Sequence, residues 1–347
     1  MSNKEELKTL KDVQDFRVDM DRPLHSATHE EILSGKTTDV YFIRTMEILT
    51  HMGLQEKVVT AEVFPRKAGI MAGIREAENI LRDKNIKIWA IEEGDSFEAM
   101  DTVVRIEGPY SEFGIFETVV LGCLSSASGW ATAARDCRQA CGDKPFVCFG
   151  SRHVHPAVAP VMERVAVIGG ANNASCILGA KLIGKEPTGT VPHAAFIIAG
   201  DTLKVAEVYD SITPEEHSRI ILVDTFKDEV EETLRVANRL KERLGGIRLD
   251  TPSERGGVTP GLVRELRARL DQEGFNWVKI FVSGGLNPDK IRLLSDAGAD
   301  AFGVGSYISS AAPIDMTMDI KEVEGKAIAK RGRIPGLIHN DKLKRIK

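Results

Sequence analysis

The sequence has no C-x-x-C pair, no long hydrophobic run and no strong excess of charge of either sign. Its five cysteines are odd in number, which argues against a disulfide framework and a zinc ribbon and predicts buried, reduced thiols. The 46 Lys and Arg residues against 51 Asp and Glu give a formal charge of -5, so the chain lacks the basic excess that nucleic acids require. We therefore expect small-molecule partners and no nucleic acid.

Nothing in the sequence suggests a membrane protein. The amino-terminal residues are charged and contain no apolar stretch suited to a signal peptide. The uncharged segment 165–180 is broken by two glycines and two asparagines, and it is shorter than the ~20 apolar residues that span a bilayer. We expect a cytoplasmic protein without a membrane anchor.

The second half of the chain alternates between two patterns. From residue 219 onward, short apolar runs typical of buried strands are followed by amphipathic helical segments. Strands are predicted at 219–226, 247–249, 277–282 and 301–304, and helices at 228–244, 260–270 and 289–297. Gly245 and Gly246 are expected to end the first of these helices. Repeated strand–helix units predict a parallel sheet, as in an α/β barrel.

The first part of the chain has a different texture. A helix is predicted at 67–82 and strands at 87–91 and 102–106, which indicates an α+β domain. A long helical stretch at 112–140 is expected to lead into the barrel.

The length of 347 residues allows two domains or one barrel with an appendage. We predict an α+β domain at 1–120, a barrel at 121–312, and a tail at 313–347 that returns to the first domain through strands at 320–323 and 327–329. The basic residues 342–347 are expected to be solvated.

Two glycine-rich turns follow the last two predicted strands. Ser283, Gly284 and Gly285 follow one strand, and Gly303 and Gly305 belong to the next. Turns at this end of an α/β barrel bind phosphate, because glycine lets backbone N–H groups approach the anion closely. Either turn alone could be a plain tight turn, but their pairing favours a phosphate site.

Two polar clusters lie before these turns. Arg152, His153 and His155 follow the predicted strand 146–148 and suit an anion clamp, although the histidines could instead cap a helix that begins near Pro156. Thr190 and His193 follow a glycine turn. A histidine there could act as acid, base or nucleophile toward a phosphoryl group, or it could simply start a helix.

A third cluster is acidic. Asp224 and Asp250 each follow a buried strand, with Arg248 two residues before the second acid. Such carboxylates can hold ribose hydroxyls or Mg²⁺, or stabilise a positive charge that develops on a sugar carbon, but they could also cap helices. Lys279 lies inside a predicted strand and is expected to point into a site or to pair with a carboxylate.

In their order and spacing, these motifs resemble the nicotinate phosphoribosyltransferases, a type II phosphoribosyltransferase group, with the archaeal-type branch closest. The resemblance covers residues 38–333. It rests on Asp39-Val-Tyr41 with Arg44, Glu93-Gly94-Asp95, Phe149-Gly-Ser-Arg152-His-Val-His155, Gly169-Gly170, Gly189-Thr190-Val-Pro-His193, Leu222-Val-Asp224-Thr-Phe, Arg248-Leu-Asp250, Ser283-Gly-Gly-Leu286 and Phe302-Gly-Val-Gly305.

The resemblance implies transfer of a phosphoribosyl group from 5-phosphoribosyl-1-pyrophosphate (PRPP) to the ring nitrogen of nicotinate, with ATP as a co-substrate and Mg²⁺ as cofactor. It implies an incomplete α/β barrel with an open-faced α+β sandwich domain. It also implies a homodimer, or a higher oligomer, in which the amino-terminal segment with Tyr41 and Arg44 caps a neighbour's site and Tyr41 stacks on the pyridine ring.

The resemblance also implies a role for each site residue. Asp224 and Asp250 would face the ribose, Arg152 with Thr190 would hold the nicotinate carboxylate beside His155, and His193 would be phosphorylated by ATP. Arg248 and Lys279 would meet pyrophosphate or phosphate. Backbone donors for the 5-phosphate would come from Ser283, Gly284, Gly285, Gly303 and Gly305.

The chain departs from the family pattern in two places. Relatives often have a second arginine where this chain has His153, and archaeal-type relatives continue into a cysteine-rich zinc-binding tail, whereas this sequence stops at Lys347. No metal-dependent folding is therefore expected.

Other activities remain as alternatives. Nicotinamide or quinolinate could be the base instead of nicotinate. Quinolinate ranks below nicotinate because quinolinate enzymes lack the Gly-Thr-x-x-His element. A phosphosugar aldolase or isomerase that uses Lys279 is more distant. A non-catalytic sensor of phosphoribosyl ligands is a further possibility.

Overall fold

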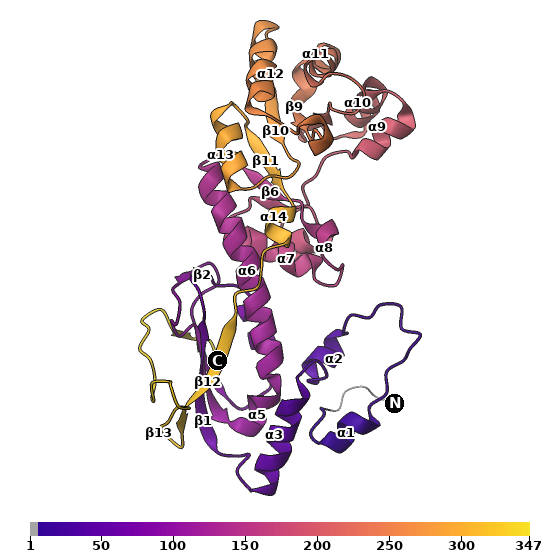
Figure 1. Ribbon diagram of the computed structural model, residues 1–347. Helices are drawn as coiled ribbons and strands as arrows, with labels where there is room; N and C mark the ends of the chain where they lie inside the picture. Colours follow the sequence, from indigo (N-terminus) through magenta and orange to yellow (C-terminus); the bar gives the residue numbers. More distant parts are fainter. Residues whose placement is uncertain (1–5) are drawn as a thin grey trace. The chain divides into compact units, whose positions relative to one another are not determined.

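The computed structural model describes residues 6–347 and divides the chain into two compact units (Figure 1). One unit consists of Met1–Thr132 with Ala312–Lys347, and the other of Ala133–Ala311. Residues 1–5 lie outside the described residues. They begin the amino-terminal segment in which no signal peptide is expected. The predicted capping of a neighbouring subunit by the first domain stays a prediction.

The first unit is built on an antiparallel six-stranded sheet in the order β13-β12-β1-β5-β3-β14. Its strands are β1 (Val58–Pro65), β3 (Lys87–Ala90), β5 (Val104–Pro109), β12 (Met316–Val323), β13 (Lys326–Ala327) and β14 (Lys344–Arg345). Strand β1 lies between β12 and β5 and is buried at every position after the first, so it forms the centre of this sheet. A short pair, β2 (Gly69–Ile70) and β4 (Ser96–Phe97), stands apart.

The described part of this unit contains, wholly or in part, the helices α1 (Leu10–Asp15), α2 (His29–Leu33), α3 (Val40–His51), α4 (Ile74–Ile80), α5 (Tyr110–Phe113) and α6 (Glu117–Cys141). The helix predicted at 67–82 is wrong in its first half, where β2 lies instead. The cause is Gly73, whose φ of +88° and whose closeness to the Cys123 carbonyl leave no room for a side chain. The chain can become helical only after this residue.

The carboxyl-terminal residues are not simply solvated. Strand β14 pairs with β3, and Leu343 and Ile346 on either side of it pack against the hydrophobic core of the first unit. Because basic residues dominate this segment, the sequence pattern did not reveal Leu343 and Ile346 as the apolar residues that anchor the tail.

One helical stretch, Tyr110–Cys141, is long and apolar enough to cross a membrane by length and composition. From the sequence, a different segment, 165–180, had been considered as a membrane span. Its most apolar window is 56% buried, and Val120, Leu124 and Ala131 are inaccessible or nearly so, as in the core helix of a globular protein.

The second unit contains a parallel six-stranded sheet in the order β7-β6-β11-β10-β9-β8. Its strands are β6 (Phe146–Cys148), β7 (Asn173–Ala174), β8 (Arg219–Leu222), β9 (Leu244–Leu249), β10 (Lys279–Val282) and β11 (Ala301–Val304). Strands β7 and β8 form the two edges and do not pair with each other, so the curled sheet is an incomplete barrel. The predicted fold class is confirmed.

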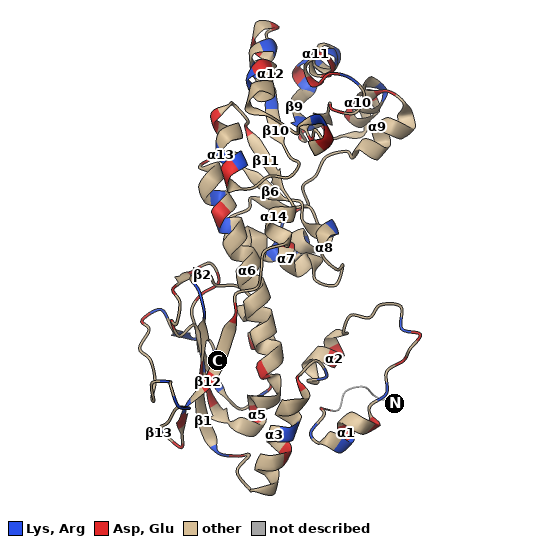
Figure 2. Ribbon diagram, viewed as in Figure 1, with Lys and Arg blue, Asp and Glu red and all other residues tan. Residues whose placement is uncertain are grey.

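The helices of this unit are α7 (Ala159–Gly169), α8 (Ile177–Lys181), α9 (His193–Ala199), α10 (Thr202–Ile212), α11 (Glu229–Leu240), α12 (Pro260–Gln272), α13 (Pro288–Asp296) and α14 (Ser306–Ser309). Acidic and basic residues are intermixed along α11, α12 and α13 (Figure 2). On α11 the opposite face buries Val230, Val236 and Leu240, which is the pattern of a helix covering a sheet.

The helix after β8 ends at Leu240, before the glycines that were expected to stop it. Gly245 and Gly246 belong to β9 instead. A side chain at Gly245 would collide with the Ser218 hydroxyl, so the glycine serves close strand packing there.

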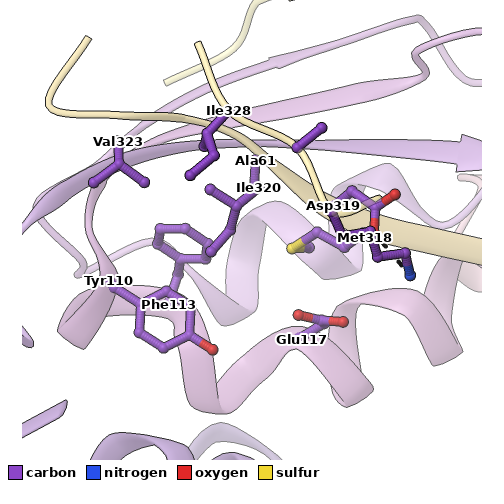
Figure 3. A pocket seen from close by; sticks show the side chains of 11 residues that line it. Ala61, Tyr110, Phe113, Glu117, Met318, Asp319, Ile320, Val323 and Ile328 are labelled. Carbon is purple, nitrogen blue, oxygen red and sulfur yellow. Dashed lines mark ion pairs between the residues drawn. The ribbon is translucent and has the colours of Figure 1, made fainter. Parts of the chain in front are cut away.

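The first unit also holds a cavity of about 460 Å³ between β12 and the helices α5 and α6. In Figure 3 Tyr110, Phe113 and Glu117 face the side chains of β12 across it. Burial, with the charge of Asp319 as the second cause, raises the pKa of Glu117 to about 7, and Lys330 opposes the shift. The ionised form of Glu117 is therefore disfavoured in the folded protein.

This shift predicts a pH-dependent loss of stability. Because the folded pKa of Glu117 lies above the ordinary value of 4.5, its contribution to folding is complete below pH 4.5 and is lost as the pH rises through about 7. Glu117→Gln should therefore raise the melting temperature relative to wild type more at pH 8 than at pH 5. The exposed Glu56→Gln is the control, and an equal effect of Glu117→Gln at both pH values would contradict the account.

Candidate active site

Most of the chemically interesting residues of the second unit converge on one pocket of about 360 Å³. It lies at the carboxyl ends of β6, β7, β9, β10 and β11, where the loops of a parallel sheet gather. Its lining consists of Phe149, Arg152, His153, Ser175, Gly189, Thr190, Pro192, His193, Leu222, Arg248, Asp250, Ser283, Gly284, Gly285, Gly303, Gly305 and Ser306.

A histidine and a buried aspartate form the first part of the site. Nε2 of His193 lies 3.0 Å from Oδ1 of Asp224, whose side chain is only 1% exposed. The other oxygen of Asp224 accepts the backbone N–H of Asp250 at 3.0 Å. Burial raises the pKa of Asp224, whereas His193 and the hydrogen bonds lower it. A buried acid thus orients an imidazole that lines the pocket, as a general acid, base or nucleophile requires.

An arginine-centred network forms the second part. Arg248 donates to Asp250 Oδ2 at 3.2 Å, to Thr190 Oγ1 at 2.8 Å and to Ser283 Oγ at 2.8 Å. The Ser283 hydroxyl in turn donates to Asp250 Oδ1 at 2.8 Å, and the guanidinium lies 5.2 Å from the centre of the Phe149 ring. Burial lowers the pKa of Arg248 from its high ordinary value, and Asp250 opposes this. Asp250 is therefore fixed at the pocket wall before any ligand binds.

The bend after β10 is open to a ligand. Gly284 and Gly285 are exposed and have φ values of +93° and +58°, which glycine adopts without strain. A side chain at Gly284 would approach Asp250 Oδ1 to 3.1 Å. Within residues 6–347 their backbone N–H groups have no hydrogen-bond acceptor. These donors suit an anion such as a phosphate.

The bend after β11 is more closed. The Phe149 ring covers Gly303, and a side chain at Gly303 would approach it to 2.5 Å. A side chain at Gly305 would meet the Phe149 carbonyl at 2.9 Å. Both glycines line the pocket, but packing against Phe149 accounts for their lack of a side chain.

Two family models match this chain. One, described as the N-terminal domain of quinolinate phosphoribosyl transferase, matches residues 39–128, and the other, described as the C-terminal domain, matches residues 130–319. The chain belongs to the quinolinate phosphoribosyltransferase family. The expectation of a type II phosphoribosyltransferase is thereby confirmed. The narrower choice of the nicotinate branch is not, because these models favour the quinolinate alternative that the sequence had ranked lower.

The individual relatives include both nicotinate-nucleotide pyrophosphorylases and nicotinate phosphoribosyltransferases. A crystal structure of nicotinate-nucleotide pyrophosphorylase from Pyrococcus furiosus has a TM-score of 0.87 and 45% identity, covering 91% of this chain and 82% of that one. A probable carboxylating nicotinate-nucleotide pyrophosphorylase of Methanothermobacter thermautotrophicus is 23% identical over 80% of this chain and 92% of its own. A nicotinate phosphoribosyltransferase of Mycobacterium tuberculosis is 30% identical over 70% of this chain, which spans 53% of that relative.

Within this phosphoribosyltransferase fold, three residues assigned to the site lie differently from their prediction. Lys279 is at the amino end of β10, at the opposite end of the strand from the pocket, and 67% exposed. It pairs with Asp300 at 3.4 Å, which is the carboxylate alternative and not the site role. His155 does not line the pocket, and its Nδ1 accepts the Ala157 N–H at 3.1 Å in the turn that precedes α7, whose N-cap Val158 has no side-chain cap. The Ser283 N–H donates to the Leu249 carbonyl, so Ser283 has no backbone donor left for phosphate.

Tyr41 and Arg44 are exposed on α3 of the first unit. Their role at a neighbouring subunit's site stays a prediction.

The sequence analysis missed several residues that line the pocket, among them Ser175 and Ser306. Ser175 follows β7, a strand of only two residues that is too short to leave a periodic pattern. Ser306 starts a helix of four residues. Phe149 and Gly189 were part of the quoted motifs without a role in the site, whereas His153 had been placed in the anion clamp and lines the pocket.

The carboxylates of the pocket do not form a metal site of their own. Among residues 6–347 no cluster of three or more His, Cys, Asp or Glu side chains could hold a metal ion. Asp224 is engaged by His193 and the Asp250 N–H, and Asp250 by Arg248 and Ser283. The Mg²⁺ that the family resemblance implies stays a prediction.

The open bend after β10 leads to a prediction about phosphate binding. Gly284→Ala should weaken binding of ribose 5-phosphate by about tenfold or more, because the new methyl group strains the left-handed backbone beside Asp250 and displaces the free N–H groups. Gly274→Ala is a matched control, since Gly274 has φ +81° with no atom nearby. Calorimetric titration measures both variants, and equal affinity of Gly284→Ala and wild type would contradict a phosphate site at this bend.

Proposed function

We propose that this protein forms nicotinate mononucleotide and pyrophosphate from PRPP and a pyridine carboxylate, with quinolinate as the base. The observation that carries the proposal is one pocket with three features: backbone N–H groups at Gly284–Gly285 that find no acceptor among residues 6–347, a fixed acid at Asp250, and an arginine at Arg152. The family match, whose models are described by quinolinate, supports the choice of base.

In the proposed reaction, the bond from the anomeric carbon to pyrophosphate breaks and the pyrophosphate leaves with the electron pair. The ring nitrogen of the base supplies the electron pair of the new bond. With quinolinate, the carboxyl group beside the ring nitrogen then departs as CO₂, and a proton takes its place. Asp250 would stabilise the positive charge that develops on the sugar, because its oxygens are already held at the wall by Arg248 and Ser283.

Arg152 is the candidate for the carboxylate of the base. It is exposed, it lines the pocket, and within residues 6–347 it forms no ion pair with a carboxylate. Its Nε–H donates to His153 Nε2 at 3.4 Å, so the imidazole of His153 helps to orient the guanidinium. A guanidinium binds a carboxylate through two parallel hydrogen bonds.

Nicotinate with ATP is the second candidate, and one observation favours it specifically. The imidazole of His193 is partly exposed in the pocket and is oriented by Asp224, as a phosphorylated histidine would require. Nicotinate phosphoribosyltransferases are also among the relatives. In that reaction ATP would phosphorylate His193, with ADP as the leaving group, and no CO₂ would be formed.

An assay with the three bases separates these readings. We expect the protein to consume quinolinate and PRPP and to release one CO₂ for each nucleotide. Turnover of nicotinate without quinolinate would contradict the choice of base, and turnover of nicotinamide alone would contradict the carboxylate clamp. A protein that binds nicotinate mononucleotide tightly but turns over no base would be a sensor instead.

Variants of the clamp and of the histidine complete the test. Arg152→Ala should raise the KM for the base by about tenfold or more with little change in the KM for PRPP, because it removes a charge-assisted contact to the base alone. Labelling from γ-³²P-ATP that is lost in His193→Ala would favour the nicotinate reaction. Absence of labelling in an enzyme active on quinolinate is the result that our proposal expects.

A further inference from the structure

A buried carboxylate behind the pocket has no role in the chemistry described so far. Glu163 lies on α7, its residue is 0% exposed, and it is not among the residues that line the pocket. Burial of a charged group without partners is costly, so the contacts of this side chain indicate what it does.

Both oxygens of Glu163 are held by hydrogen-bond donors from two loops. Oε1 accepts from the Ser151 N–H at 3.1 Å and from its hydroxyl at 2.6 Å. Oε2 accepts from the Ser175 N–H at 2.7 Å and from the Cys176 N–H at 2.6 Å. The Ser175 hydroxyl lies 3.0 Å from Oε1 and 3.3 Å from Oε2. Three backbone donors and two hydroxyls thus meet on one carboxylate.

These donors belong to the loops that follow two neighbouring strands. Ser151 lies after β6, and Ser175 and Cys176 lie directly after β7, which pairs with β6. The N–H groups of Ser151 and Cys176 lie beyond the ends of these strands and bond to Glu163, and the Ser175 N–H is shared between Glu163 and the Cys148 carbonyl of β6 at 3.2 Å. Gly179 of α8 comes so close that a side chain there would lie 3.3 Å from the Glu163 Cβ, which leaves the carboxylate little freedom.

The loop held in this way carries the candidate base-binding residues. Ser151 is the first residue of the single 3-10 turn η2 (Ser151–His153), and Arg152 and His153 complete that turn. Ser175, held by the same carboxylate, lines the pocket itself. The position of Arg152 relative to the pocket therefore depends on the contacts of Glu163 with Ser151.

We propose that Glu163 is a positioning residue that sets the affinity for the pyridine carboxylate by fixing the turn that carries Arg152. The identity of the ligand rests on the proposed function, whereas the fixing of the two loops does not. Glu163 touches no reacting atom in this account, so it should affect the KM for the base and leave the later steps of the reaction unchanged.

Glu163→Gln is the direct test, because the two side chains have nearly the same shape. Either orientation of the amide places its NH₂ group against a backbone N–H, of Ser151 on one side or of Ser175 and Cys176 on the other, so at least one loop must be released. We expect the KM for the base to rise by about tenfold or more, with kcat and the KM for PRPP within about twofold of wild type.

Two further variants make the result specific. Glu232→Gln removes another fully buried carboxylate of the same unit, which pairs with Arg235 on α11 and does not line the pocket, and it should leave every kinetic constant unchanged. Ser151→Ala removes only the hydroxyl bond to Glu163 and should raise the KM for the base by about threefold. If Glu163→Gln does not fold, Ser151→Ala tests the positioning role by itself: an unchanged KM for the base in this variant would overturn that role.

Hydrogen exchange gives a readout that does not depend on activity. In Glu163→Gln the amides of residues 149–153 and 174–177 should exchange at least about tenfold faster, while those of β10 stay as protected as in wild type. Unchanged exchange in both loops would overturn the fixing of the loops. Faster exchange with an unchanged KM for the base would overturn the positioning role. If the wild type turns over no base, the proposed function fails, and the exchange data still decide whether Glu163 holds the loops.

Discussion

At the carboxyl edge of the parallel sheet in this protein, three carboxylates accept hydrogen bonds from donors in the neighbouring loops and so join one strand end to the next. Glu163 joins the loops after β6 and β7, Asp224 receives the Asp250 N–H and so joins β8 to β9, and Asp250 receives the Ser283 hydroxyl and so joins β9 to β10. Each hydrogen bond to a charged group contributes on the order of 1.5–3 kcal/mol. The edge of the incomplete barrel is therefore held together by the same kind of interaction that shapes the pocket.

This arrangement explains why the pocket is preformed. Arg248 compensates the charge of Asp250, and His193 lies against Asp224, so these carboxylates are not isolated charges. In the described part of the chain, the N–H groups of Gly284 and Gly285 have no acceptor and Arg152 has no ion pair, and all three residues line the space where a ligand would lie. The carboxylates in the wall of the pocket thus have hydrogen-bond partners, whereas the donors that line its interior are available to a ligand. This is the arrangement expected for a site that binds anions.

Much of the second unit could be predicted from the sequence, because its strands and helices carry strong periodic patterns. The strands β8 to β11 and the helices α11 to α13 were located within a few residues. Short elements without a period, such as β7, were not found, and neither was the central strand β1 of the first unit. The glycines misled in two places: Gly245 and Gly246 continue a strand, and Gly73 delays a helix, because close contacts in the fold decide their roles.

The structure brings predicted site residues together where a residue type and a motif agreed, and separates them where only a pattern within one strand was available. Asp250, Arg248 and His193 lie together, although they are far apart in the sequence. For Lys279 the sequence left a site role and a carboxylate partner open, and the structure shows the partner, Asp300. A strand of four residues has two ends, and only the three-dimensional structure shows that Lys279 lies at the end away from the pocket. The hydrogen bonds of Ser283 to Arg248 and Asp250, and of Glu163 to Ser151, join residues whose spacing in the sequence gives no sign of contact.

The central claim is that a sugar phosphate binds at the bend after β10, with its anomeric carbon beside Asp250. A crystal structure with nicotinate mononucleotide tests this most directly. We predict that the phosphate oxygens accept the N–H groups of Gly284 and Gly285 and that the pyridine carboxylate lies against Arg152. A phosphorus atom outside this pocket, or a nucleotide bound with the base at the bend, would contradict the account.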